Sequence, residues 1–109
     1  MIVLVEPELV VAKLLEADNR RYFTFQRLLK FVAYLNEQLE KMNALPENRD
    51  IKCVVSFSSI RRALEYEYKK YDIIGDTVVL RKEIKDDYSQ GFPELYNTIT
   101  TITEKFAEL

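Results

Sequence analysis

Residues 58–82, SSIRRALEYEYKKYDIIGDTVVLRK, contain the pattern of a helix followed directly by that of a β-hairpin. Apolar side chains recur three and four positions apart over residues 58–71, which predicts a helix with one buried side. Two β-prone runs then flank Gly75-Asp76, and a glycine at the first loop position suits a type II′ turn. We therefore expect a helix over 58–71 and a hairpin over 72–82.

Two long helices are predicted on either side of this stretch. Residues 24–43 start with Thr24, which can cap a first turn, and residues 93–108 start with Pro93, whose missing N–H would be unpaired there anyway. Both segments carry an apolar side chain every three or four residues, forming one apolar stripe each. Such stripes suit either the core of one chain or a contact between two chains. We expect a homodimer joined through Leu28, Val32, Leu35, Leu39, Ile99, Ile102 and Phe106.

The remaining segments complete a mainly helical domain. A further helix is expected over residues 7–17, again with a proline in its first turn. Residues 2–5 are a short apolar run that suits an edge strand or the approach to that helix, and residues 46–57 suit either a strand or a short helix. With 109 residues and no repeat or linker-like tract, the chain 1–109 is expected to be one domain, mainly α with a small β-hairpin (α+β).

The composition excludes several kinds of catalytic and metal site. There is no histidine, which removes Ser-His-Asp and Cys-His catalysis and the commonest zinc ligand sets. Two glycines are too few for the usual phosphate-binding loops. We expect no enzyme activity, no cofactor and no metal. The single cysteine, Cys53, lies in an apolar run, which predicts an inert thiol. Because one thiol cannot form an intrachain disulfide, we expect a reducing, cytoplasmic compartment. No apolar run approaches the roughly 18 residues of a membrane helix, so no membrane partner is expected.

Charge and overall composition carry two weaker signals. The net charge of −2 by itself argues against a nucleic-acid partner. Residues 20–83 nevertheless hold 13 Lys/Arg and 9 Asp/Glu, whereas the two ends together hold 3 Lys and 9 Asp/Glu. The middle is thus mildly basic between acidic flanks, a distribution that chance and solubility also produce. Abundant Glu, Lys, Ile, Val and Tyr without Trp are typical of a thermophile or its virus.

Three segments of the chain carry a resemblance to a known family. The first contains Leu45-Pro46, Glu47 and Arg49, and the second contains Ser56 and the run Ser58 to Leu64. The third contains Asp72 to Ile74 and Thr77 to Leu80. In this order they resemble the winged helix-turn-helix of GntR-type regulators. The resemblance implies a winged-helix-like fold flanked by N- and C-terminal helices, in which 58–71 is the recognition helix and 72–82 is the wing. It also implies a small DNA-binding protein that acts in transcription regulation.

A recognition helix enters the major groove of double-stranded DNA by its N-terminal turns, and nearby cations neutralise phosphates. The expected DNA-binding residues are Ser58, Ser59, Arg61, Arg62, Lys69, Lys70, Arg81 and Lys82. Arg61 also stands four residues before Glu65, so a surface ion pair is its alternative role. For the whole chain the alternative is a helical interaction or assembly protein without a nucleic-acid role, which the two apolar stripes and the acidic flanks favour.

Overall fold

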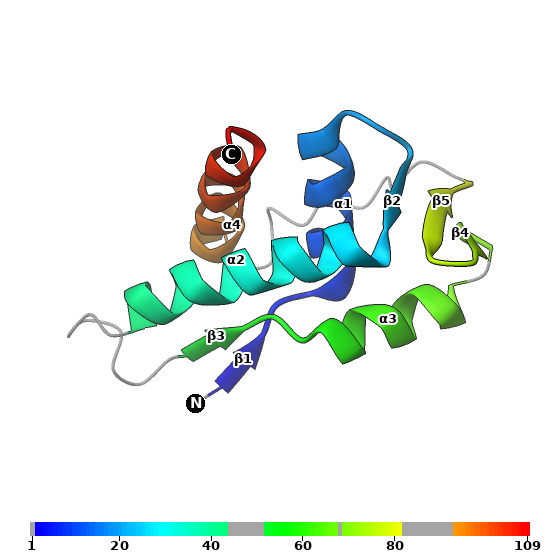
Figure 1. Ribbon diagram of the computed structural model, residues 1–109. Helices are drawn as coiled ribbons and strands as arrows, with labels where there is room; N and C mark the ends of the chain where they lie inside the picture. The colour runs from blue at the N-terminus through cyan, green and yellow to red at the C-terminus, as the bar shows by residue number, and fades with distance from the viewer. Residues whose placement is uncertain (1, 44–51, 68, 82–92) are drawn as a thin grey trace.

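The computed structural model describes residues 2–43, 52–67, 69–81 and 93–109. The elements follow one another in the order β1 (Ile2–Leu4), α1 (Pro7–Asp18), β2 (Tyr22–Thr24), α2 (Phe25–Asn43), β3 (Lys52–Val54), α3 (Phe57–Tyr66), β4 (Tyr71–Ile74), β5 (Thr77–Leu80) and α4 (Pro93–Ala107). In Figure 1, α2 crosses the middle of the view, with α1 and α4 above it and β1, β3 and α3 below it. The expected fold class, mainly α with a small β-hairpin (α+β), is confirmed, and the hairpin belongs to a three-stranded antiparallel sheet.

The helices predicted over 7–17, 24–43 and 93–108 form with bounds that agree to within one residue. At the end of α1, Asn19 adopts the left-handed conformation with φ of 50°, and its N–H donates to the carbonyl of Glu16 at 3.2 Å. At the start of α2, Thr24 Oγ1 accepts the backbone N–H of Arg27 at 3.1 Å, which is the predicted cap. Local signals therefore set the ends of these helices.

The helix predicted over 58–71 is shorter than expected, because α3 ends at Tyr66. The backbone N–H groups of Lys70 and Tyr71 both donate to the carbonyl of Glu67, which makes a turn instead of a further helical segment. Tyr71 then begins β4, where its side chain is only 3% exposed. A helix and a strand would both bury Tyr71, so its apolar character did not distinguish between them.

The hairpin predicted over 72–82 belongs to a three-stranded antiparallel sheet with the order β2–β5–β4. Gly75 has φ of +64° and Asp76 has no positive φ, which is the expected signature of a type II′ turn. Phe23 in β2 pairs with Val78 in β5, and both side chains are buried on the inner side of the sheet. β2 was not expected from the sequence.

The base and the turn of the hairpin are both joined to other elements. The N–H of Leu80 donates to the carbonyl of Arg21, beside β2, and the N–H of Arg81 donates to the carbonyl of Lys70, in the turn after α3. At the other end, the N–H of Phe25, the first residue of α2, donates to the carbonyl of Asp76 at 2.8 Å. The sheet is therefore attached to α2 and to the end of α3.

β1 and β3 form a second, separate pair of strands that run parallel, with Ile2 beside Lys52 and Leu4 beside Val54. Of the two alternatives for residues 2–5 the strand is thus the one observed. The same holds for residues 52–54 of the ambiguous segment 46–57, whereas residues 46–51 lie outside the described parts of the chain.

The side chain of Asn36 hydrogen-bonds the segment after β3 to α2. Asn36 Nδ2 donates to the carbonyl of Val55 at 2.8 Å, and Asn36 Oδ1 accepts the N–H of Val55 at 2.8 Å. These two hydrogen bonds satisfy both backbone groups of a residue that is only 2% exposed. Because Val55 immediately precedes the cap of α3, Asn36 also fixes where α3 begins.

The apolar stripes of α2 and α4 form the core of this one chain. The seven residues predicted to form a dimer interface are all at most 5% exposed within the chain itself: Leu28, Val32, Leu35, Leu39, Ile99, Ile102 and Phe106. The ring of Phe106 lies 4.9 Å from that of Phe31 and 5.5 Å from that of Tyr34, centroid to centroid. The predicted dimer contact through these residues is therefore wrong, because the same spacing serves packing between α2 and α4 of one chain.

Candidate nucleic-acid interface

α3 buries one side and exposes the other. Ile60 and Leu64, one turn apart, are each 1% exposed and belong to the core. The opposite side consists of exposed residues that we call the α3 outer face: Ser58, Arg61, Arg62, Glu65 and Tyr66. Tyr66 is 76% exposed, so a large aromatic ring extends into solvent at the C-terminal end of this face. An α-helix exposed along one side in this way can fit into the major groove of double-stranded DNA.

The first turn of α3 is capped by the side chain of Ser56. Ser56 has extended backbone angles, and its Oγ accepts the backbone N–H of Ser59 at 3.2 Å. Of the two serines expected to contact DNA, Ser58 is exposed, whereas Ser59 is half-buried and its N–H is used by the cap. Only Ser58 therefore presents its hydroxyl on the α3 outer face.

The two arginines on the α3 outer face have different surroundings. Arg61 Nε lies 3.4 Å from Glu65 Oε1, and its guanidinium lies 5.2 Å from the centre of the Phe25 ring. The ion pair that was the alternative role of Arg61 is thus present. Arg62 is exposed and makes no ion pair with the described residues. Its guanidinium is the more available of the two for an external acceptor.

The two lysines after α3 also differ. Lys69 is exposed in the turn, and no ion pair joins it to the part of the chain that the structure describes. Lys70 is only partly exposed, and its Nζ lies 3.6 Å from Glu8 Oε1 on α1. This contact spans two elements far apart in the sequence, so Lys70 already has a carboxylate partner within the fold.

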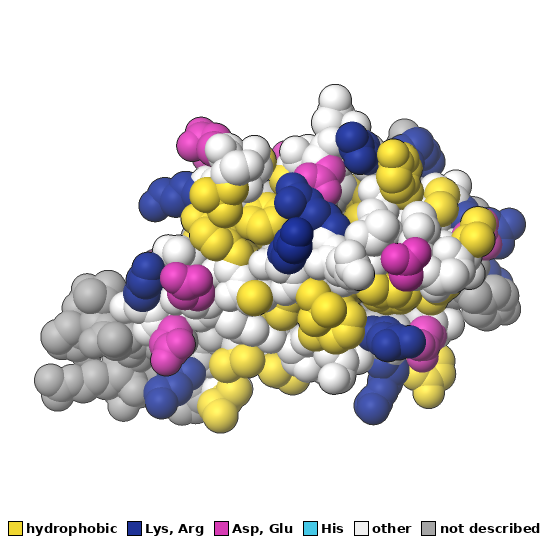
Figure 2. All heavy atoms as spheres, in the orientation of Figure 1, with side chains coloured by type: hydrophobic (Ala, Val, Ile, Leu, Met, Phe, Trp, Pro, Cys, Tyr) yellow, Lys and Arg dark blue, Asp and Glu magenta, His cyan; other side chains and the backbone are white. Residues whose placement is uncertain are grey.

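The hairpin contributes one described cation, and it is paired. Arg81 Nε lies 3.4 Å from Asp72 Oδ2 on the neighbouring strand, with about half of each side chain exposed. Lys82, the other cation expected in the wing, lies outside the described residues. In Figure 2 the Lys and Arg side chains over α3 stand beside acidic and apolar ones and do not form one continuous positive patch on this side. Of the seven predicted contact residues that the structure describes, only Ser58, Arg62 and Lys69 combine exposure with no ion pair to a described residue.

A further cationic and aromatic group lies at the start of β2, and sequence reasoning missed it. The guanidinium of Arg20 lies 5.6 Å from the centre of the Tyr22 ring, which is 45% exposed, and Arg21 beside it is also exposed. The sequence signal for β2, which positions this group, was the alternation of Tyr22, Phe23 and Thr24 after a helix end. Three residues are too few for a period to be detected.

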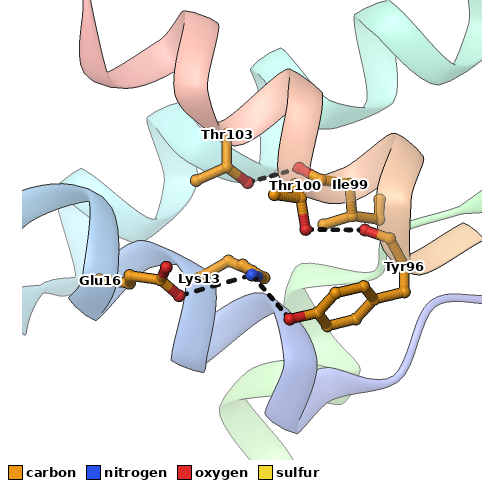
Figure 3. Close-up of polar contacts among 6 residues, drawn as sticks. All are labelled: Lys13, Glu16, Tyr96, Ile99, Thr100 and Thr103. Atoms are coloured by element: carbon orange, nitrogen blue, oxygen red, sulfur yellow. Dashed lines mark hydrogen bonds and ion pairs between the residues drawn. The ribbon is translucent and has the colours of Figure 1, made fainter. Parts of the chain in front are cut away.

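A second feature that the sequence did not predict is a buried lysine between α1 and α4. Lys13 is 6% exposed, and its Nζ donates to the hydroxyl of Tyr96 at 3.2 Å and lies 3.4 Å from Glu16 Oε2. Figure 3 shows this ammonium between the two partners, with Thr100 and Thr103 on the facing helix. Both threonine hydroxyls donate to backbone carbonyls of α4 itself. Among the described residues, the polar contacts of the Lys13 ammonium are those with Tyr96 and Glu16. The group holds α1 to α4.

The chemistry of the remaining reactive groups is limited. Burial raises the pKa of the Cys53 thiol, which lowers its thiolate fraction at neutral pH, as expected for an inert cysteine. Within residues 2–43, 52–67, 69–81 and 93–109, no group of three or more Cys, Asp or Glu side chains is placed to hold a metal ion. The helices in these ranges include none with the length and apolar character required to cross a membrane. Comparisons with protein-family models, curated proteins and solved structures found no match to this chain.

Proposed function

We propose that this chain binds double-stranded DNA as a winged helix, with α3 in the major groove and the β4–β5 hairpin beside it. The observation that supports this proposal most is the order α1, β2, α2, β3, α3, β4, β5, in which β2 pairs with β5, the second strand of the hairpin. β3, which lies between α2 and α3, pairs with β1 in a separate sheet. In winged helices a strand after the first helix likewise completes the sheet of the wing. The unit then starts at α1, whereas the sequence pattern suggested that it starts at the long helix.

The exposure of α3 supports its role as the recognition helix. Its buried side is formed by Ile60 and Leu64, so Ser58 and Arg62 point outward from the first two turns. Recognition helices contact base edges with these N-terminal turns. An arginine there can donate two hydrogen bonds to guanine O6 and N7, which is the commonest base-specific contact in the major groove.

Phosphate contacts would come from cations at the end of α3 and in the sheet. Among the described cations expected to contact DNA after α3 and in the hairpin, Lys69 is available for this role without the loss of an ion pair. Lys70 and Arg81 would have to exchange a carboxylate, Glu8 or Asp72, for a phosphate. This exchange lowers their contribution to affinity, because the existing ion pair is lost when the phosphate binds. We therefore assign base contact to Arg62 and backbone contact to Lys69.

Fluorescence anisotropy with a labelled duplex, measured at several salt concentrations, tests the proposal. We expect affinity to fall steeply with salt, because bound cations release counterions from the phosphates. Arg62→Ala should weaken binding to a selected sequence by roughly 5- to 100-fold, and Lys69→Ala should lower the slope of log K against log salt by about 1.

Lys105→Ala is the matched control for the lysine variant. Lys105 is exposed on α4, on the other side of α2 from α3, and its removal changes the net charge equally. Affinity should be almost unchanged. The proposal fails if no binding is detected at about 50 mM salt, or if Lys105→Ala weakens binding as much as Lys69→Ala does.

The second candidate function is an interaction or assembly protein without a nucleic-acid role. The pairing of Arg61 with Glu65 on the α3 outer face favours it, because this pairing halves the unpaired arginine charge there. The net charge of −2 also favours it. Absence of DNA binding at about 50 mM salt, together with self-association or capture of a protein partner, would support this alternative.

A further inference from the structure

The parallel pair β1–β3 has one apolar face that no described part of the chain covers. Because side chains alternate along a strand, Ile2, Leu4 and Val54 lie on the face opposite Cys53, which packs against the core. These three side chains are 70%, 59% and 36% exposed. Figure 2 shows apolar side chains along the lower edge of the molecule, where Figure 1 places β1 and β3.

An exposed face is unusual for this kind of pairing. Parallel strands occur almost only in sheets with both faces covered, and an isolated pair of strands is marginally stable in water. Here α2 packs against β3, and Cys53 on the inner face packs against the core. The other face leaves neighbouring apolar side chains in contact with water, which favours covering it with another apolar surface.

The charges at the two ends of this face are opposite. Lys52 is exposed at the start of β3, beside Ile2, and Glu6 is exposed two residues beyond Leu4, past the end of β1. Neither residue makes an ion pair with any part of the chain that the structure describes. We call Ile2, Leu4, Val54 and these two charged residues the ribbon face.

We propose that a second copy of this chain covers the ribbon face, with the two β1–β3 pairs packed face to face and antiparallel about a two-fold axis. This arrangement brings Leu4 against the partner's Leu4 and brings Lys52 to the end where the partner subunit's Glu6 lies. An apolar centre with one positive and one negative end is complementary to itself, as a two-fold interface requires. A partner with a single sign of charge would match only one end.

This interface differs from the one that the sequence suggested, since the stripes of α2 and α4 lie in the core of each chain. It is also independent of DNA binding, because the α3 outer face takes no part in it. Sedimentation equilibrium can therefore test it without any nucleic acid, and failure of one proposal leaves the other standing.

The first test uses a lysine in the apolar centre. Leu4→Lys should raise the dimer Kd by about 100-fold or more, because a two-fold interface would bury the new charge twice. Ile74→Lys is the matched control, since Ile74 is 68% exposed at the hairpin turn and should leave the Kd unchanged. A dimer that Leu4→Lys does not weaken would overturn the proposal, as would a wild-type chain that remains monomeric at about 0.1 mM.

The second test exchanges the charges, and it still decides the question if Leu4→Lys fails to fold. Lys52→Glu alone and Glu6→Lys alone should each raise the dimer Kd by about tenfold, since like charges would then face each other twice. The double variant should recover the wild-type Kd to within about threefold. A double variant weaker than either single variant would exclude the antiparallel pairing, and an unaltered Kd in all three would exclude the ribbon face.

Discussion

Asn36→Ala should destabilise the fold more than its partly exposed position suggests. The substitution removes two hydrogen bonds of 2.8 Å and leaves both the N–H and the carbonyl of Val55 without their partner. Val55 is 2% exposed, so water reaches these groups poorly. A buried polar group that loses its partner costs about 1–3 kcal/mol, and two such groups with partial access of water cost about 2–4 kcal/mol.

Part of this loss is offset, because alanine is better than asparagine in a helix by about 0.5 kcal/mol. The net decrease in the free energy of unfolding is then about 1.5–3.5 kcal/mol, which lowers Tm by roughly 6–20 °C in a domain of this size. Urea unfolding followed by circular dichroism measures the first quantity, and a thermal scan measures the second.

Gln26→Ala is the control for this prediction. Gln26 is exposed on the same helix and its carboxamide makes no hydrogen bond with the described residues, so the same loss of a carboxamide should leave stability within about 0.5 kcal/mol. If Asn36→Ala differs from Gln26→Ala by less than about 1 kcal/mol, the two hydrogen bonds do not hold the start of α3, and the reasoning is refuted.

Four further outcomes follow from the structure. Phe106→Ala should cost about 3–5 kcal/mol, since the ring contacts Phe31 and Tyr34, and calorimetry should show the domain largely unfolded if its stability is near 5 kcal/mol. Tyr96→Phe should cost about 0.5–1.5 kcal/mol by removing the hydroxyl that Lys13 contacts; no change in urea unfolding would mean that Lys13 depends on Glu16 alone. Gly75→Ala should cost about 1–2 kcal/mol from its φ of +64° alone, because a methyl group there meets no atom within 4 Å, whereas Gly75→Asn should cost less. The raised pKa of Cys53 means that the folded state favours the protonated thiol. The stabilisation that this thiol gives the folded state is therefore present below the ordinary pKa of 9.0 and is lost as the pH rises further. Cys53→Ala should show a weaker pH dependence of the free energy of unfolding above that value, and identical dependences in the two proteins would contradict this.

The parts of the fold that the sequence predicts are those with a long enough pattern. α2 and α4 repeat their apolar spacing over 19 and 15 residues, and a cap or a proline marks where each begins. The hairpin was predictable because Gly75 at the turn has a specific backbone requirement. In each case one local rule, the apolar spacing of a helix or the backbone requirement of a turn, is sufficient to predict the element.

What the sequence could not supply depends on contacts between distant segments. β1, β2 and β3 are three residues each, which is too short for alternation to decide. A strand was therefore only one of two alternatives for β1 and β3, and β2 was not predicted. β1 also pairs with a strand about fifty residues away. The same apolar spacing serves a core and a dimer contact, so the stripe of α2 could not show which one it forms. Within the candidate interface, the predicted exposure of Arg62 and Lys69 agrees with the structure, but the pairing of Lys70 with Glu8 needed the position of α1.

The hydrogen bond between Asp76 and Phe25 has a practical consequence for anyone who alters this protein. Hairpin tips are usually where a chain tolerates an inserted loop or a cut. Here the carbonyl at the tip accepts the first N–H of the longest helix at 2.8 Å, so an epitope placed between Gly75 and Asp76 would displace that oxygen and loosen the start of α2. A label intended to leave the domain intact is better attached after Leu109, which is 85% exposed.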